Sequence, residues 1–155
     1  MGKRREGREA AVQFLYQSDV NRRPVAELLA DFWKLRSGPG KAEASPKTRA
    51  FTEELVKGVT AHAAEIDAHI VKCTANYEIH RIAVVDRNIL RVGIYEMLHC
   101  TDVPPVVSIN EAIEIAKKFG SEESGRFVNG ILDRLRGELT RDARGGGGKS
   151  EVISS

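Results

Sequence analysis

The segment IHRIAVVDRNILRVGIYEMLHCT, from Ile79 to Thr101, decides the fold class of this chain. Its apolar residues recur every three or four positions and form one wide stripe, which holds Ile82, Val85, Ile89, Val92 and Met97, with Leu90, Ile94 and Leu98 beside them. This period is that of an α-helix with a buried face. We therefore predict one long helix over about residues 79–101, roughly 33 Å in length, as the spine of a helical bundle.

Helical periodicity continues on both sides of this segment. It predicts helices over residues 4–20, from Pro24 to about residue 35, from about Thr48 to residue 73 with a kink or turn on the way, and over 122–139. Two prolines end the long helix, and Ser108 and Glu111 then match the S-x-x-E capping box that begins another. No convincing strand is present, so the fold class is an all-α bundle.

Composition places the chain among globular proteins with one core. Its 155 residues are 41% hydrophobic and 30% charged, and the net charge of +2 is too small to diagnose nucleic-acid binding. The two cysteines, Cys73 and Cys100, do not make a disulfide framework, and we expect reduced thiols. No apolar run approaches the roughly 20 residues that span a bilayer, and no apolar signal core follows the basic amino terminus. We expect a cytoplasmic protein with no membrane partner.

The chain offers no convincing catalytic or metal site. The four histidines, at 62, 69, 80 and 99, are dispersed, and no acidic or cysteine partner completes a metal set in the sequence. The run Gly145–Gly148 before Lys149 lacks the spacing of a phosphate loop, so residues 140–155 are predicted to be a disordered glycine-rich tail. We expect no cofactor, no metal and no enzymatic activity.

Arginines of the first predicted helix suggest a binding surface. Arg4, Arg5 and Arg8 recur at three- and four-residue spacing, and Tyr16 lies two turns further on. Arginines that hold phosphates beside a ring that stacks on a base can bind single-stranded RNA. Tyr16 as a residue at the edge of the core is the alternative, and both interpretations stay open. Arg126 and Phe127 repeat the pairing of a cation with a ring in the last helix.

Several motifs together resemble the bacterial NusB family. They are Arg8-Glu9 leading to QFLY at 13–16, VDRNILR at 85–91, Tyr95-Glu96, Asp102-Val103-Pro104, INEA at 109–112, AKKFG at 116–120 and FVNG at 127–130. The match runs from about Arg4 to Leu139 in the order and spacing of the family. The resemblance implies about seven helices in two small subdomains, with residues 1–139 as an RNA-binding helical domain.

The same resemblance implies a function without catalysis. Members of the family bind the boxA element of nascent ribosomal RNA together with the ribosomal protein NusE, and that complex joins RNA polymerase to suppress termination. By position, the residues implied for RNA binding are Arg4, Arg5, Arg8, Gln13, Tyr16, Glu123, Arg126 and Phe127. Arg91 and Glu96 fall where the family meets its protein partner.

Two alternatives accompany this interpretation. Some family members form homodimers that can occlude the RNA surface, so a protein-interaction homodimer is the second candidate. A related helical module precedes a catalytic domain in RNA cytosine methyltransferases, but the glycine-rich cofactor segment of those enzymes is missing here. Replacing Arg5 and Arg8 by alanine is expected to weaken RNA binding while melting barely changes.

Overall fold

The computed structural model describes residues 2–40, 43–75 and 78–145, and within these ranges the chain is helical without a strand. The elements in chain order are α1 (Gly2–Asn21), α2 (Val25–Arg36), α3 (Pro46–Ala61), α4 (Ala63–Cys73), the 3-10 turn η1 (Ile79–Arg81), α5 (Val84–His99), α6 (Pro105–Phe119) and α7 (Glu122–Gly145). The predicted all-α bundle of about seven helices is confirmed. None of the described helices is both long enough and apolar enough to pass through a bilayer.

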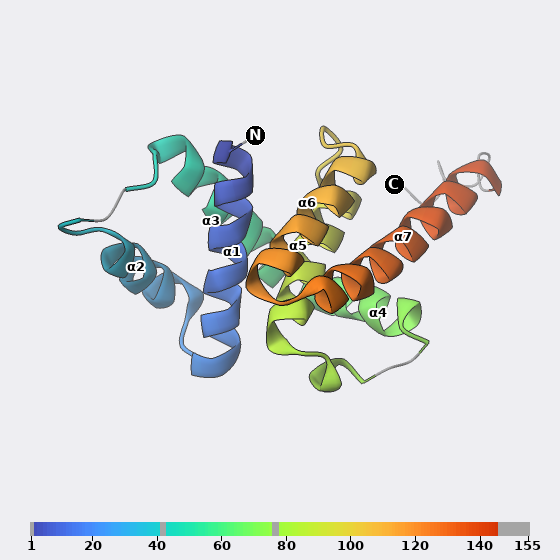
Figure 1. Cartoon of the computed structure of the whole chain (residues 1–155), viewed down its shortest axis with the longest axis horizontal. Helices are drawn as coiled ribbons and strands as arrows, with labels where there is room; N and C mark the ends of the chain where they lie inside the picture. Colours follow the sequence, from blue (N-terminus) through green and yellow to red (C-terminus); the bar gives the residue numbers. More distant parts are fainter. Residues whose placement is uncertain (1, 41–42, 76–77, 146–155) are drawn as a thin grey trace.

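The helices form two groups that meet at α5. Helix α1 packs against α2 and α3 on one side of the molecule, and α4 to α7 pack together on the other (Figure 1). Helix α5 contacts α1 and α3 of the first group as well as its own neighbours α4, α6 and α7. One hydrophobic core runs through both groups, with fully buried side chains from Phe14 of α1 to Leu135 of α7. This arrangement agrees with two small subdomains that share a core.

The segment 79–101 does not form the single long helix predicted from its periodicity. The turn η1 is followed by extended backbone at Ile82 and Ala83, and α5 begins only at Val84. The Arg87 guanidinium donates hydrogen bonds to the carbonyl oxygens of Ile79 (3.2 Å) and Ile82 (3.3 Å). These bonds hold η1 against α5. The apolar stripe is therefore continuous along the sequence, although the helix is interrupted at Ile82 and Ala83.

The predicted capping box at Ser108 is also wrong. Helix α6 begins one turn earlier, at Pro105, because proline suits the first helical position. Ser108 is therefore a buried residue inside the helix, where its hydroxyl donates to Glu96 Oε1 (3.0 Å). Glu111 does not cap the helix but pairs with Arg5.

Helix α7 is longer than predicted, since it continues to Gly145. The predicted disordered tail was placed at 140–155, so its first six residues are helical, and residues 146–155 lie outside the described ranges. Both cysteines are free thiols, as expected. Cys73 is buried, whereas Cys100 is partly exposed.

Candidate nucleic-acid interface

The structure places Arg8 in the core and not on a surface that could meet RNA. Its side chain is 5% exposed, and its Nε lies 3.0 and 2.9 Å from the two carboxylate oxygens of Glu96. Glu96 also accepts the hydroxyl of Ser108, so one buried cluster joins α1, α5 and α6. Buried charges persist when they are paired and hydrogen-bonded. Arg8, predicted for RNA binding, and Glu96, predicted for partner binding, are thus paired with each other inside the molecule.

Arg5 is held across the molecule by Glu111 of α6. Nε and one terminal nitrogen of Arg5 donate to the two carboxylate oxygens of Glu111 at 2.8 and 2.9 Å. The hydrogen bond from Arg5 keeps the pKa of the Glu111 carboxyl below its usual range. One third of the Arg5 side chain stays exposed. Arg5 can therefore contact a phosphate only through the exposed third of its side chain, beside its ion pair with Glu111.

Arg4 is exposed but lies apart from the other candidates. Its guanidinium stacks 4.6 Å from the ring centre of Phe51, in a hollow that α1 shares with α3. Twelve residues separate Arg4 from Tyr16, a rise of about 18 Å along a helix. The arginines and Tyr16 thus do not form one continuous stripe.

The second half of α1 borders a cavity of about 540 Å³, the α1–α6 hollow. It draws on four helices and is lined by Gln13, Tyr16, Gln17, Phe32, Leu35, Arg36, Val85 and Phe119. Tyr16 is 43% exposed at its wall, so its ring face is available to a planar ligand. Gln13 is oriented by a hydrogen bond that its amide oxygen accepts from Arg36. Two predicted residues therefore share this hollow.

A second cavity, of about 290 Å³, lies at the start of α7 and is here called the α5–α7 hollow. Its lining residues are Arg81, Ile82, Ala83, Asp86, Ser121, Glu123, Ser124 and Phe127. Burial raises the pKa of the Asp86 carboxyl, although a hydrogen bond from Ser124 (3.4 Å) opposes that effect. Arg126 directly precedes Phe127 in α7. It is exposed, and its side chain pairs with no other described residue.

The two hollows are neighbours because consecutive residues of α5 line them. Val85 faces the α1–α6 hollow, and Asp86 faces the α5–α7 hollow. Gln13 and Tyr16 thus line one hollow, and Glu123 and Phe127 line the other. Arg4 lines neither of them and lies near the amino end of α1.

The structure adds lining residues that the sequence did not single out for binding. Phe119 packs against the core and also lines the α1–α6 hollow, with the Lys118 ammonium 5.8 Å from its ring centre. Arg36 and Arg81 each contribute a cation to one hollow. In the sequence, Arg36 was a basic residue at the end of a short helical segment, which is common for reasons of the helix dipole alone. Arg81 lay near the start of the long predicted helix and carried no binding signal.

Arg91 belongs to a polar cluster between helices. It donates to both carboxylate oxygens of Asp67 on α4 (2.9 and 3.1 Å), to Asp19 on α1 (3.0 Å) and to Asn88 (3.0 Å). Arg87 and the buried Asn88 also donate to Asp19. The DRNILR motif therefore fixes α5 against α1 and α4. Arg91, predicted for partner binding, is largely buried and engaged by Asp19 and Asp67.

Comparison with known proteins agrees with this geometry. A family model described as the NusB family matches residues 5–136. This chain belongs to the NusB family. The transcription antitermination protein NusB of Myxococcus xanthus (strain DK1622) is 44% identical over 141 residues, which is 91% of this chain and 99% of that protein. The resemblance inferred from the motifs is confirmed.

Solved structures of the family superpose well on the chain. T. maritima NusB has a TM-score of 0.73 at 35% identity, covering 85% of this chain and 89% of that one. A complex described as antitermination factors NusB and NusE with double-stranded RNA has a TM-score of 0.75 at 27% identity, covering 87% and 96%. The chain is thus related to transcription antitermination proteins and is not an enzyme.

Proposed function

We propose that this protein is a transcription antitermination factor that binds boxA-type single-stranded RNA of nascent ribosomal RNA transcripts together with NusE. The observation that carries the proposal is the pair of hollows lined by consecutive residues of α5, with Tyr16 in the wall of one and Phe127 in the wall of the other. Arg126, which precedes Phe127 in α7, is exposed and unpaired among the described residues. The relationship to a NusB that was solved with NusE and double-stranded RNA supports RNA and NusE as the classes of partner.

Recognition in this proposal divides between bases and phosphates. The exposed face of Tyr16 and the partly exposed ring of Phe127 stack on unpaired bases, which contributes about 1–3 kcal/mol per base. Arg126 and the exposed Arg81 contact phosphates and release counterions. An RNA strand that follows α1 toward its amino end would also bring a phosphate to the exposed Arg4.

Polar groups in the hollows supply specificity. The carboxylate of Glu123 can accept a hydrogen bond from a base amino group such as that of cytosine, while it repels a phosphate. Gln13, held by Arg36, offers an amide nitrogen to a base edge. Arg5 contributes at the border through the part of its side chain that Glu111 leaves exposed.

NusE and the RNA polymerase antitermination complex are the proposed protein partners, and the cytoplasm is the proposed location. Because Arg91 and Glu96 are engaged inside the molecule, their role in partner binding is indirect: they hold α5 in place. The competing homodimer would cover the hollows and would weaken RNA binding as the protein concentration rises.

A gel-shift experiment tests the proposal. Wild-type protein is titrated against a boxA RNA, a scrambled RNA and a duplex RNA, each with and without NusE. We expect boxA RNA to bind most tightly when NusE is present, and light scattering on the same samples reports any homodimer. Equal affinity for boxA and scrambled RNA in the presence of NusE would overturn sequence-specific recognition.

A further inference from the structure

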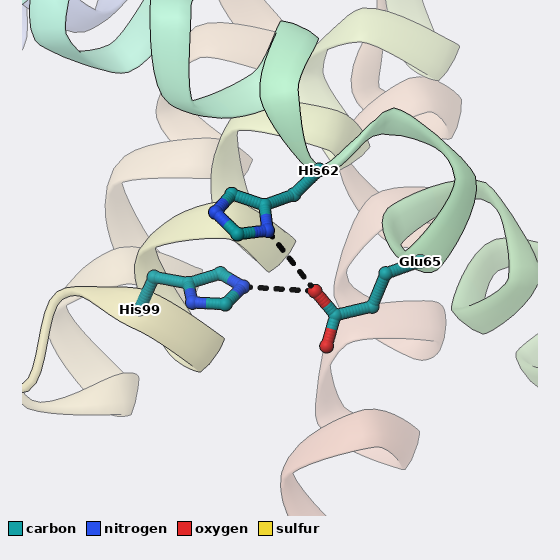
Figure 2. A group of neighbouring side chains, drawn as sticks. All are labelled: His62, Glu65 and His99. Atoms are coloured by element: carbon teal, nitrogen blue, oxygen red, sulfur yellow. Dashed lines mark hydrogen bonds and ion pairs between the residues drawn. The ribbon is translucent and has the colours of Figure 1, made fainter.

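Two histidines and a glutamate from two separate segments of the chain meet where α3 turns into α4, beside the end of α5. His62 forms the junction between α3 and α4, Glu65 lies in the first turn of α4, and His99 is the last residue of α5. Figure 2 shows both imidazole rings directed at the Glu65 carboxylate. We propose that these three residues form a binding site for a divalent transition-metal ion, with Zn²⁺ as the best match.

The donor atoms converge on one point. Glu65 Oε1 lies 2.9 Å from His99 Nε2 and 3.6 Å from His62 Nδ1, and all three ligand atoms lie within 4.8 Å of one another. Bond lengths of about 2.0–2.2 Å in a tetrahedral zinc site place neighbouring donor atoms about 3.3 Å apart. The two distances from Glu65 lie on either side of that value, and the two imidazole nitrogens lie within 4.8 Å of each other, so side-chain rotations can bring the three donors into coordination.

The surroundings leave room for an ion and for that adjustment. The side chains of His62, Glu65 and His99 are 42%, 47% and 28% exposed, so an ion can enter and water can complete its coordination. The imidazole rings stack with their centres 4.0 Å apart, and Tyr95 lies alongside His99 at 5.4 Å. This stacking holds the two rings side by side before any ion arrives.

The ligand chemistry selects the type of metal. Two neutral imidazoles and one carboxylate suit zinc and its neighbours among the transition metals, whereas calcium and magnesium prefer oxygen ligands throughout. Three protein ligands with an open position form a site that exchanges its ion more readily than a closed four-ligand site. A bound ion would join the α3–α4 junction to the end of α5, in place of the hydrogen bond between Glu65 and His99, because coordination uses the same two atoms.

The sequence concealed this site because its donors come from two separate segments. Glu65 follows His62 by three residues, but His99 is 34 residues beyond Glu65 and carries no spacing signal. The prediction of no metal set rested on the dispersal of the four histidines along the sequence and on the lack of an acidic or cysteine partner at ligand spacing. Only the packing of α4 against α5 reveals the third ligand.

Isothermal titration calorimetry with Zn²⁺ alone tests the proposal. The full chain is used without a histidine tag, in a buffer free of chelators. We expect one equivalent of Zn²⁺ to bind per chain and to raise the melting temperature, because a ligand that binds only the folded state stabilises it. His99→Ala and Glu65→Gln should each weaken binding by at least about tenfold, since loss of second-shell support alone costs about 10–100-fold.

His80→Ala is the matched control, because the exposed His80 pairs with Glu78 at 3.2 Å without a second imidazole nearby. It should bind Zn²⁺ as the wild type does, and so should Cys100→Ser, which removes the neighbouring thiol. Glu65→Gln keeps the side-chain shape, so it remains informative if His99→Ala does not fold. The proposal is overturned if wild type shows no stoichiometric binding, if His99→Ala and Glu65→Gln bind normally, or if Cys100→Ser or His80→Ala abolishes binding.

Discussion

Arg8 and Arg126 are both helical arginines that the sequence assigned to RNA binding, but their surroundings give them opposite roles. Arg8 is buried against Glu96, where it neutralises a carboxylate that water cannot reach. Arg126 is exposed in the first turns of α7 and has no partner among the described residues. The sequence predicted one role for both, because residue type and spacing do not report which face of a helix a neighbouring helix covers.

Arg8→Ala is expected to destabilise the protein strongly. The substitution leaves Glu96 buried without its cation, and loss of one member of a buried ion pair typically costs about 3–5 kcal/mol. Urea unfolding measures the change, and Arg126→Ala is the matched control, with an expected change within about 0.5 kcal/mol. If Arg8→Ala unfolds at the same urea concentration as wild type, the cluster of Arg8, Glu96 and Ser108 does not stabilise the fold. From the sequence, melting was expected to change little when Arg5 and Arg8 are replaced by alanine. The burial of Arg8 replaces that expectation with a strong destabilisation.

Glu111→Gln is expected to remove part of the pH dependence of stability. Arg5 lowers the folded-state pKa of Glu111, so the ionised carboxylate stabilises the folded protein above its unfolded pKa, about 4.3. This contribution is lost as the pH falls through the lower folded-state value. Wild type should therefore exceed the variant in stability at about pH 7, and the difference should shrink toward about pH 3. Urea midpoints of both proteins across that range provide the test; a difference that grows on acidification would contradict it.

At the scale of elements, periodicity located most helices but not their ends. The helices over 4–20, 24–35 and 48–73 were predicted within a few residues, including the turn that separates α3 from α4 at His62. The break at Ile82 and Ala83 could not be predicted, because it depends on hydrogen bonds from Arg87 to backbone that precedes α5. The start of α6 was misplaced because Ser108, a good capping residue, is used as a buried donor.

Two glycines inside helices should respond in opposite ways to alanine. A Cβ at Gly130 would meet no atom within 4 Å, so Gly130→Ala gains helix propensity and should stabilise by about 0.5–1 kcal/mol. A Cβ at Gly7 would lie 2.6 Å from Phe51 Cδ2, so Gly7→Ala should destabilise by separating α1 from α3. Thermal unfolding of both variants decides the matter, and a stabilised Gly7→Ala would contradict the packing of α1 on α3.

At the scale of the whole molecule, the candidate surface is assembled from distant parts of the chain. Tyr16 of α1, Phe119 of α6 and Phe127 of α7 reach it only because α5 supports all three helices. The family resemblance named Gln13, Tyr16, Glu123, Arg126 and Phe127 by position. Composition and periodicity alone could not have grouped them, since the grouping is a product of tertiary packing.

The salt dependence of RNA binding distinguishes a phosphate contact made by Arg126 from a general effect of the protein's charge. In the presence of NusE, Arg126→Ala should weaken RNA binding and reduce the slope of log affinity against log salt by about 0.7, the value for one phosphate contact on a single strand. Arg136 lies on the same helix and pairs with Asp133 (3.1 Å), so Arg136→Ala is the matched control and should keep the wild-type slope. Equal slopes for all three proteins would exclude Arg126 from phosphate binding.

The most direct test of the central claim is chemical-shift mapping of the isotope-labelled protein, with NusE and boxA RNA added in turn. The account predicts that RNA shifts the amide signals of residues lining the two hollows, in the second half of α1, at the start of α5 and around the turn from α6 to α7. Shifts caused by RNA that fall instead on the outer faces of α3 and α4, with the hollows unperturbed, would contradict it.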